Sequence, residues 1–255
     1  MPSPSSTFTG HVMRKDTPVA QVRNSQLISV AKNAPLYLQK RGDFQGWLKD
    51  RGADLTRGNM RIILKQLGLP LQDIETAVKS VNAASITDSF WIKPHDSNIL
   101  YNDIVFKSDT YSKAALAGDP DIFTLPKNRS PELTNIGSFN KGWKLENGKW
   151  YLYKSGTAQE IFSELFTSKL ARLLNMDAVN YFIKDGYIVC ESFVSSTQDL
   201  ETAKAIIGEN CDYPHVYNIM ESHGLAKSYM DIIFMDAIVR NTDRHEFRAC
   251  CHYRQ

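Results

Sequence analysis

The sequence predicts an α+β fold, and three features indicate it. Two pairs of alternating apolar and polar stretches flank tight-turn dipeptides, Asn147-Gly148 in the first pair and Asp185-Gly186 in the second. Asn, Asp and Gly tolerate the left-handed backbone of a two-residue hairpin turn, so these dipeptides are strong hairpin signals. Apolar residues at helical spacing lie between the two pairs and again near the C-terminus. We therefore expect an antiparallel sheet with a helix packed on it, followed mostly by helices.

Composition limits the class of protein. The chain has 255 residues, enough for one large or two small domains with a sizeable core. Its formal net charge of +2 argues against nucleic acid as a direct ligand. No apolar run approaches the ~20 residues that span a bilayer, and the N-terminus lacks the pattern of a secretory signal. Because the cysteines form no disulfide framework, we expect a cytoplasmic protein without membrane contact.

The chain divides into five expected segments. Residues 1–10 are rich in Ser and Pro and predict a disordered tail. Residues 11–94 predict a small α+β N-terminal region, and the polar segment 95–134 predicts a long connecting loop. Residues 135–196 contain both hairpins and the helix between them, and residues 197–255 predict a helical lobe.

The N-terminal region begins with alternating stretches that predict a hairpin or meander from Gly10 to Val30. Three short helices are expected after it, the second ending at Gly68, a typical C-cap. The basic residues on or beside the first two of these helices are Arg51, Arg57, Arg61 and Lys65. We expect a solvated basic helix face here, and contact with an anionic partner is the alternative.

The segment from Tyr229 to His245 is an apolar helix that runs into a tight, charged turn. The apolar residues that recur at helical spacing are Tyr229, Ile232, Ile233 and Val239. Asp236 falls on the same face, where an unpaired carboxylate would be costly. The turn contains Asp243 and His245, which a buried helix of this kind can hold rigidly as catalytic residues. A helix end with solvated charges is the alternative interpretation.

The string Asn241-Thr242-Asp243-Arg244-His245 resembles the catalytic loop of the HipA-like serine/threonine kinases, bacterial kinases known from toxin–antitoxin pairs. In that family the loop follows the pattern N-x-D-x-H-x-x-N. The segment Ser85–Pro94, expected to dock the N-terminal region on the later part of the chain, is similar to a recurring LTDxYWIKP segment of HipA-like proteins. The resemblance covers roughly residues 85–247. It implies a protein-kinase-like small lobe before a helical large lobe, ATP and Mg²⁺ as cofactors, and a protein substrate or antitoxin-like partner.

A candidate phosphate loop, residues 135–142, precedes the first hairpin. Gly137 and Gly142 allow close backbone approach, and the N–H groups around Ser138 together with Lys141 can face anionic oxygens. The position of this segment is similar to that of the phosphate loop in HipA-like kinases. An ordinary turn is the alternative.

Lys154 ends the second strand of the first hairpin, where a lysine is usually just solvated. The resemblance implies that it is the nucleotide-binding lysine. Its partner carboxylate should come from the next helix, which offers Glu160 and Glu164. We favour Glu164, because its offset from Leu170-Ala171 resembles the family pattern.

The strand Val189–Phe193 leads out of the second hairpin and contains Glu191. The resemblance implies that this strand is the hinge at the adenine edge, so Glu191 joins the predicted nucleotide-binding residues. An ordinary buried strand is the alternative.

The catalytic roles implied by the resemblance are a base at Asp243 and a supporting residue at His245. The final asparagine of the family pattern, a metal ligand, is replaced by Arg248. A guanidinium has no acceptor and cannot ligate Mg²⁺. A metal site from Cys250, Cys251 and His252 is disfavoured because adjacent cysteines lack the usual spacing, so no metal ligand is predicted.

No aspartate follows Asp243, and the tail RACCHYRQ differs in composition from the residues before it. We expect a chain truncated in or just after the catalytic loop, with phosphotransfer lost or impaired. The alternative is a non-catalytic remnant of such a kinase that binds a nucleotide or a partner.

Overall fold

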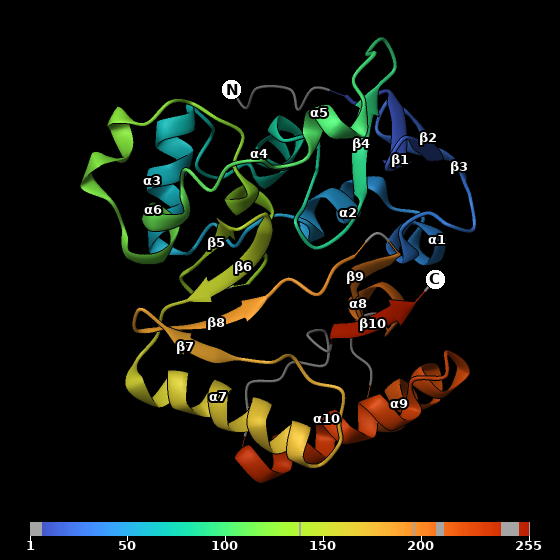
Figure 1. The fold of residues 1–255 in the computed structure, drawn as a ribbon. Coiled ribbons are helices and arrows are strands. Elements are labelled where there is room, and N and C mark those ends of the chain that lie inside the picture. Colours follow the sequence, from blue (N-terminus) through green and yellow to red (C-terminus); the bar gives the residue numbers. More distant parts are fainter. Residues whose placement is uncertain (1–6, 138, 196, 208–211, 241–249, 255) are drawn as a thin grey trace.

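The computed structural model describes residues 7–137, 139–195, 197–207, 212–240 and 250–254. Within these ranges every sheet is antiparallel, and helices pack around the sheets (Figure 1). The expected α+β class is therefore confirmed. The N-terminal sheet and its helices form the upper part of the molecule in Figure 1, and a second four-stranded sheet lies below them.

The N-terminal sheet has the strand order β3-β2-β1-β4. Its strands are β1 (Gly10–Arg14), β2 (Thr17–Arg23), β3 (Gln26–Val30) and β4 (Phe90–Pro94). The first three form the predicted meander, and β4 joins the free edge of β1 from much later in the chain. The helices packed on this sheet are α1 (Leu36–Arg41), α2 (Phe44–Asp50) and α4 (Ile74–Ser80). Val12, Phe44 and Val78 are fully buried between them in one apolar cluster.

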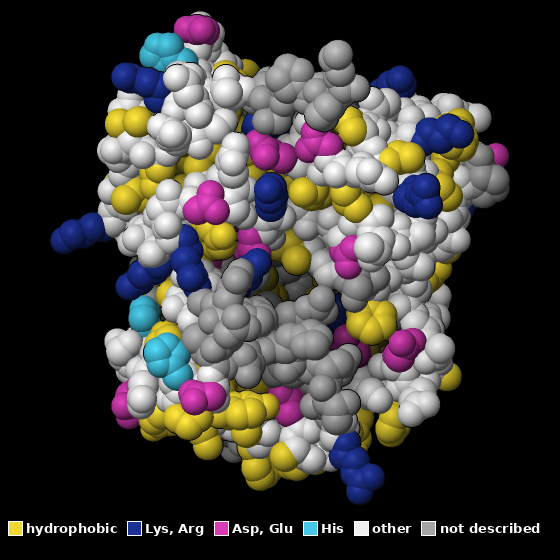
Figure 2. Space-filling view, turned by 180° about the vertical axis from the view of Figure 1, so that it is seen from behind, with side chains coloured by type: hydrophobic (Ala, Val, Ile, Leu, Met, Phe, Trp, Pro, Cys, Tyr) yellow, Lys and Arg dark blue, Asp and Glu magenta, His cyan; other side chains and the backbone are white. Residues whose placement is uncertain are grey.

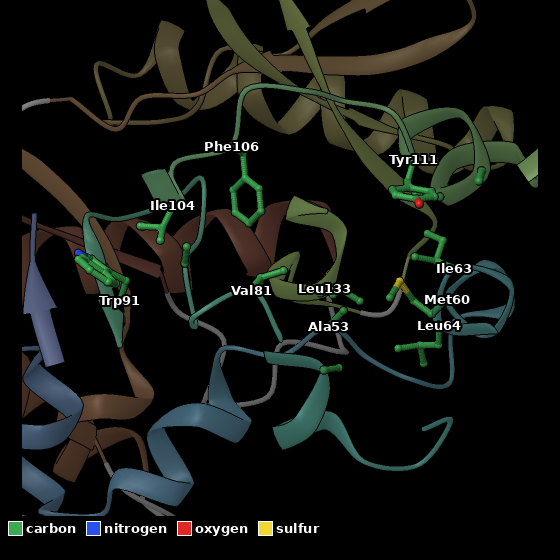
Figure 3. Close-up of a cluster of buried hydrophobic side chains, with 14 of the residues drawn as sticks. Ala53, Met60, Ile63, Leu64, Val81, Trp91, Ile104, Phe106, Tyr111 and Leu133 are labelled. Atoms are coloured by element: carbon green, nitrogen blue, oxygen red, sulfur yellow. The ribbon is translucent and has the colours of Figure 1, made fainter. Parts of the chain in front are cut away.

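A second core joins β4 to α3 (Gly58–Leu67) and α6 (Ser112–Ala117). Figure 3 shows Trp91 of β4, Met60 of α3 and Tyr111 at the start of α6 among its buried side chains. Helix α3, the second of the three helices expected in the N-terminal region, has Gly68 as its C-cap in the left-handed conformation, as predicted.

Residues 95–134 are not the plain connecting loop that their polar composition suggests. Beside α6 they contain α5 (Tyr101–Ile104) and the 3₁₀ helices η1 (Pro120–Thr124) and η2 (Pro131–Thr134). Ile104, Tyr111, Ile122 and Leu133 are buried in the second core. Helices this short complete too few turns to show a period in the sequence, and packing against the core stabilises them.

The second sheet has the strand order β5-β6-β8-β7. Its strands are β5 (Lys141–Glu146), β6 (Lys149–Lys154), β7 (Phe182–Lys184) and β8 (Tyr187–Glu191). Both predicted hairpins are confirmed, with left-handed φ angles of 50° and 78° at Asn147-Gly148 and of 53° and 79° at Asp185-Gly186. The two hairpins pair through β6 and β8 into one sheet, as expected.

The two faces of this sheet are covered differently. Tyr153 and Val189 pack with Leu116 of α6 on one face. Side chains alternate along a strand, so Leu152 and Lys154 belong to the opposite face. That face meets α7 (Ala158–Leu173), the helix predicted between the two hairpins.

Helix α7 contacts the sheet through a mostly polar edge, which corrects the expectation that its apolar residues are buried. Ser168 and Ala171 are buried, and Glu164 bonds to the sheet. Phe162, Phe166 and Leu173 are 65%, 45% and 80% exposed. Helical spacing identified the apolar stripe, but the tertiary contacts of the described residues fall on a neighbouring stripe.

The C-terminal segment contains strands as well as the helices expected there. Its elements are β9 (Gln198–Thr202), α8 (Lys204–Ile207), α9 (Tyr213–Ser222), α10 (Ala226–Val239) and β10 (Cys250–Arg254). Strand β9 pairs with β10 and docks on the N-terminal region, where the Leu200 N–H donates to the Thr87 carbonyl at 2.8 Å. Helix α10 packs on α9 around Tyr229 and Met220, while Phe234 remains 51% exposed.

Charged side chains lock β9 to the N-terminal region. Within the N-terminal region, the Arg51 guanidinium pairs with both carboxylate oxygens of buried Asp88 at 2.9 Å and so holds the segment that contacts β9. Asp199 accepts hydrogen bonds from the Ser89 N–H at 2.7 Å and from Arg14 Nη2 at 3.0 Å. Asp88 and Ser89 belong to the segment expected to dock the N-terminal region on the later part of the chain, and these contacts confirm it. We call this group of contacts the joint.

Apolar side chains gather at the lower end of the molecule. Figure 2 shows hydrophobic side chains along this end, where α7 and α10 lie in Figure 1. The exposed members on these two helices are Phe162, Phe166, Leu173, Met230, Phe234 and Ile238. Among the described residues, no helix is both long and apolar enough to cross a bilayer.

Candidate functional site

Lys154 lies at the end of β6 and points toward α7. Its ammonium group donates to Glu164 Oε1 at 2.9 Å and to the Tyr181 hydroxyl at 2.7 Å. Burial acts to lower the pKa of Lys154, but Tyr181 and Glu164 outweigh it and the pKa is raised. The expected pairing of Lys154 with Glu164 is confirmed, and the lysine is held as a cation in a partly buried position.

The start of α7 explains why Glu164, and not Glu160, meets the lysine. Thr157 and Glu160 form a capping box, in which Glu160 accepts from the Thr157 N–H at 2.7 Å. This contact uses Glu160 at the helix terminus, as capping boxes do. Glu164 follows one turn later, on the edge that faces β6.

Tyr181 is a member of this cluster that sequence reasoning missed. Ser168 of α7 fixes its backbone, since the Ser168 hydroxyl accepts from the Tyr181 N–H at 3.1 Å and donates to the Val179 carbonyl at 2.5 Å. Burial raises the pKa of Tyr181 to about 12, although the Lys154 charge lowers it, so the phenol stays protonated. Tyr181 lies just before a strand and carries no motif, so nothing in the sequence linked it to Lys154.

Cys190 lies on the same sheet face, directly opposite Leu152 of β6. Its side chain is buried, and it is a free thiol. Burial raises its pKa to about 11, against the lowering effect of the Lys154 charge. Cys190 therefore contributes a neutral, apolar wall beside the lysine.

The side chain of Glu191 does not join the cluster. Its carboxylate accepts from Lys149 Nζ at 2.7 Å and from the Tyr151 hydroxyl at 3.3 Å, in an exposed position. Tyr151 alternates with Leu152 and so points away from the Lys154 face. Any role of Glu191 at a nucleotide would therefore use its backbone, as a hinge does.

The candidate phosphate loop lies directly beside Lys154. Lys141 starts β5 and is the register partner of Lys154 in the sheet, so both lysines belong to one face. Lys141 Nζ donates to the Ile136 carbonyl and crosses over Gly137, where an added Cβ would lie 2.5 Å from the ammonium nitrogen. Because the two lysines lie on one sheet face, positive charge is concentrated beside residues 135–142. Ser138 lies outside the described residues.

Gly142 serves packing in this structure. An added Cβ would lie 2.7 Å from the Ser112 carbonyl oxygen of α6, closer than real Cβ atoms come. The expected close approach of backbone at Gly142 is therefore made to a neighbouring helix, on the face opposite Lys154.

A buried glutamate fastens both ends of the loop. Glu132 of η2 accepts from the Trp143 N–H at 2.7 Å and from the Asn135 amide at 2.9 Å. Burial raises the pKa of Glu132 to about 7, against the hydrogen bonds from Asn135 and Trp143 and the charges of Arg57 and Lys141. Sequence reasoning missed Glu132, because nothing in the polar segment around it predicts burial.

The catalytic candidates Asp243 and His245 lie outside the described residues, as do Arg244 and Arg248. Helix α10, which leads to them, ends at Arg240 in the left-handed conformation. Asp236 is half-buried on this helix.

A cavity of about 310 Å³ lies apart from the Lys154 cluster. Its walls include Asp88 and Phe90, Tyr101 of α5, Trp150 of β6, and Val194. Burial and nearby carboxylates raise the pKa of Tyr101 to about 12. The cavity borders the joint at Asp88, and neither Lys141 nor Lys154 is among its lining residues.

Across the described part of the chain, no three His, Cys, Asp or Glu side chains are grouped so that they could hold a metal ion. No family model, no curated protein and no solved structure matches this chain. The Lys154 cluster and the loop beside it are therefore the basis for a functional proposal.

Proposed function

We propose that this chain binds ATP through a small lobe of the protein-kinase type, as its resemblance to HipA-like serine/threonine kinases implies. The observation that carries the proposal is the ion pair between Lys154 of β6 and Glu164 of α7, 2.9 Å apart. In protein kinases a strand lysine pairs with a helix glutamate and contacts the nucleotide phosphates. An isolated surface ion pair contributes little to stability, so a half-buried pair held by a third residue suits positioning better.

The arrangement of elements supports the same proposal. A strand pair, a helix and a second strand pair form one antiparallel sheet, with α7 on the face that carries Lys154. This is the order of a kinase small lobe. The segment after β8 would serve as the hinge, with backbone groups near Glu191 bonding the adenine edge.

The charge distribution favours an anionic ligand. Lys154 and Lys141 face each other across β5 and β6, and Glu164 is the carboxylate paired with Lys154. Glu164 balances the charge of Lys154, and phosphate oxygens would bring further acceptors to the face that carries both lysines, with the N–H groups of residues 135–142 as further donors.

The residues present do not fit the Mg²⁺ that the kinase resemblance implies. Arg248 stands where the resemblance places a metal-binding asparagine, and its guanidinium has no acceptor. Asp243 and His245 keep the pattern of a catalytic base and a supporting residue. We therefore propose nucleotide binding with little dependence on Mg²⁺, and phosphotransfer to serine or threonine that is lost or impaired. A protein substrate or antitoxin-like partner belongs to the same proposal.

Calorimetric titration with ATP tests the binding site. Lys154→Ala should weaken ATP binding about tenfold or more, because a charge-assisted phosphate contact is lost. Lys184→Ala is the matched control, since Lys184 pairs with Glu146, which also accepts from Tyr153 on the sheet face opposite Lys154. Equal ATP affinity of wild type and Lys154→Ala, or no binding by either, would rule out the proposed site.

Labelled ATP with Mg²⁺ tests the predicted loss of phosphotransfer. Wild type and Asp243→Ala should both show background incorporation. Clear incorporation by wild type that disappears in Asp243→Ala would contradict the impairment and favour an active kinase.

A further inference from the structure

Arg57 is a buried arginine whose hydrogen-bonding capacity is largely unused. It is the residue before α3 and is only 4% exposed, although the sequence suggested a solvated basic face. Its Nη1 donates weakly to the Phe139 carbonyl at 3.4 Å. Its Nε and Nη2 are buried without a hydrogen-bond partner among the described residues. Burial lowers the pKa of Arg57, while Glu132 and Asp54 act to raise it.

The burial of a guanidinium with two unpaired nitrogens requires a physical explanation. Burying a charged donor without partners costs several kcal/mol in the general case, and native proteins rarely leave donors unpaired. Structure alone would favour an apolar side chain of similar size at this position. A charge retained under these conditions points to a task at the loop that it contacts.

Arg57 contacts the candidate phosphate loop at the Phe139 carbonyl. Glu132 fastens the two ends of that loop through Asn135 and Trp143, and Arg57 reaches Phe139 between them. The loop is thus held at its ends by Glu132 of η2 and at Phe139 by Arg57 of the N-terminal region.

Peptide geometry gives this contact a direction. In a planar trans peptide the C=O of one residue and the N–H of the next point in opposite directions. A guanidinium that holds the Phe139 carbonyl therefore leaves the Asn140 N–H pointing away from itself. An N–H oriented in this way is the kind of donor that an anion bound at the loop requires.

We propose that Arg57 is a positioning residue through which the N-terminal region sets the phosphate-binding conformation of residues 139–142. The proposal rests on the proposed nucleotide site for its consequence, but the effect on the loop itself is independent of any ligand. Nε and Nη2 are the reserve donors for further carbonyl groups of the loop.

Hydrogen exchange of the ligand-free chain tests the effect on the loop. In Arg57→Gln the amides of residues 139–142 should exchange about tenfold faster or more, because the loop opens locally more often. Arg129→Gln is the matched control, because Arg129 is a partly buried arginine whose hydrogen bonds go to Val81 and Asn82 and to no described residue of this loop. Unchanged exchange in Arg57→Gln, or the same increase in Arg129→Gln, would overturn the proposal whether or not ATP binds.

Affinities for ATP and adenosine test the consequence. Arg57→Gln should weaken ATP binding about tenfold and leave adenosine binding unchanged, since only ATP uses the loop. Arg57→Lys keeps the charge without the fork of donors and should recover part of the loss. Equal weakening of both ligands would show a general structural defect and overturn the positioning role. If wild type binds neither ligand, the proposed function fails, and the exchange data alone decide the role of Arg57 in the loop.

Discussion

Two buried arginines, six residues apart in the sequence, have opposite surroundings. Arg51 in the joint donates from Nε to the Ala83 carbonyl at 2.8 Å and from both terminal nitrogens to Asp88 at 2.9 Å. It also lies over the ring of Trp47 at 4.8 Å. Arg57 beneath the loop has one long hydrogen bond and two unpaired nitrogens among the described residues.

The difference separates two reasons for burying a charge. At the joint every guanidinium nitrogen of Arg51 is matched, so the group fixes the end of α2 to the segment that contains Asp88. Under the loop the donors exceed the acceptors, which is an inconsistency that folded chains usually restrict to functional positions. The contacts of the joint thus stabilise the fold, whereas the unpaired donors of Arg57 beside the loop are more consistent with a functional role.

Substitution of each arginine by methionine should separate the two regions most clearly. Arg51→Met leaves the Asp88 carboxylate buried without its partner and should cost about 3–5 kcal/mol of unfolding free energy. Arg57→Met removes an unpaired guanidinium and should leave stability unchanged or increase it, by up to about 4 kcal/mol. Urea denaturation of the two variants measures both values. Equal losses would show that Arg57 is as structural as Arg51.

This contrast was not visible in the sequence. Arg51, Arg57, Arg61 and Lys65 follow one another at similar spacing, yet the first two are buried and the last two are exposed. The burial of the two arginines depends on groups from distant parts of the chain. Asp88 pairs with Arg51, and the charge of Glu132 acts on Arg57. A local pattern carries no information about such partners.

Features with a local cause were predictable. The hairpins follow from Asn147-Gly148 and Asp185-Gly186, whose left-handed conformations only a few residue types tolerate. The pairing of Lys154 with Glu164 followed from a resemblance combined with helical position. By contrast, Tyr181 and Glu132 have no local sequence signature. The prediction of which edge of α7 is buried was wrong, because the apolar stripe of this helix faces outward.

The pH dependence of stability should show the buried carboxylate under the loop. The pKa of Glu132 is raised from 4.5 to about 7, so the folded state holds its proton more tightly than the unfolded state. Stability from this group is complete below pH 4.5 and is lost as the pH rises to about 7, by about 3 kcal/mol. Glu132→Gln should therefore flatten the fall in stability between these pH values.

The joint provides the comparison for this measurement. Glu201 accepts from the Leu36 N–H at 2.7 Å, and burial together with Asp88 raises its pKa to about 8. Its contribution should also be lost with rising pH, but over a range that extends to about pH 8. Denaturation curves from pH 4 to 9 for Glu132→Gln and Glu201→Gln should thus lose different parts of the wild-type slope. A wild-type profile that rises between pH 5 and 7 would contradict both assignments.

Substitution of the exposed apolar side chains of α7 and α10 should have the smallest effect on the free energy of unfolding. Phe166 of α7 and Phe234 of α10 are 45% and 51% exposed, and hydrophobic side chains gather at the end of the molecule where these two helices lie (Figures 1 and 2). Exposed aromatic side chains contribute little to folding, so Phe166→Gln and Phe234→Gln should change the unfolding free energy by about 0.5 kcal/mol or less. Contiguous apolar surface does favour association, so light scattering at high concentration should fall in both variants.

Phe123→Gln is the matched control, because Phe123 is 53% exposed but lies on η1, outside this surface. Its scattering should equal that of wild type. Equal reduction in all three variants would mean that single exposed aromatics, and not the surface shared by α7 and α10, govern association. A stability loss of about 2 kcal/mol or more in Phe234→Gln would instead mean that α10 buries this face in solution.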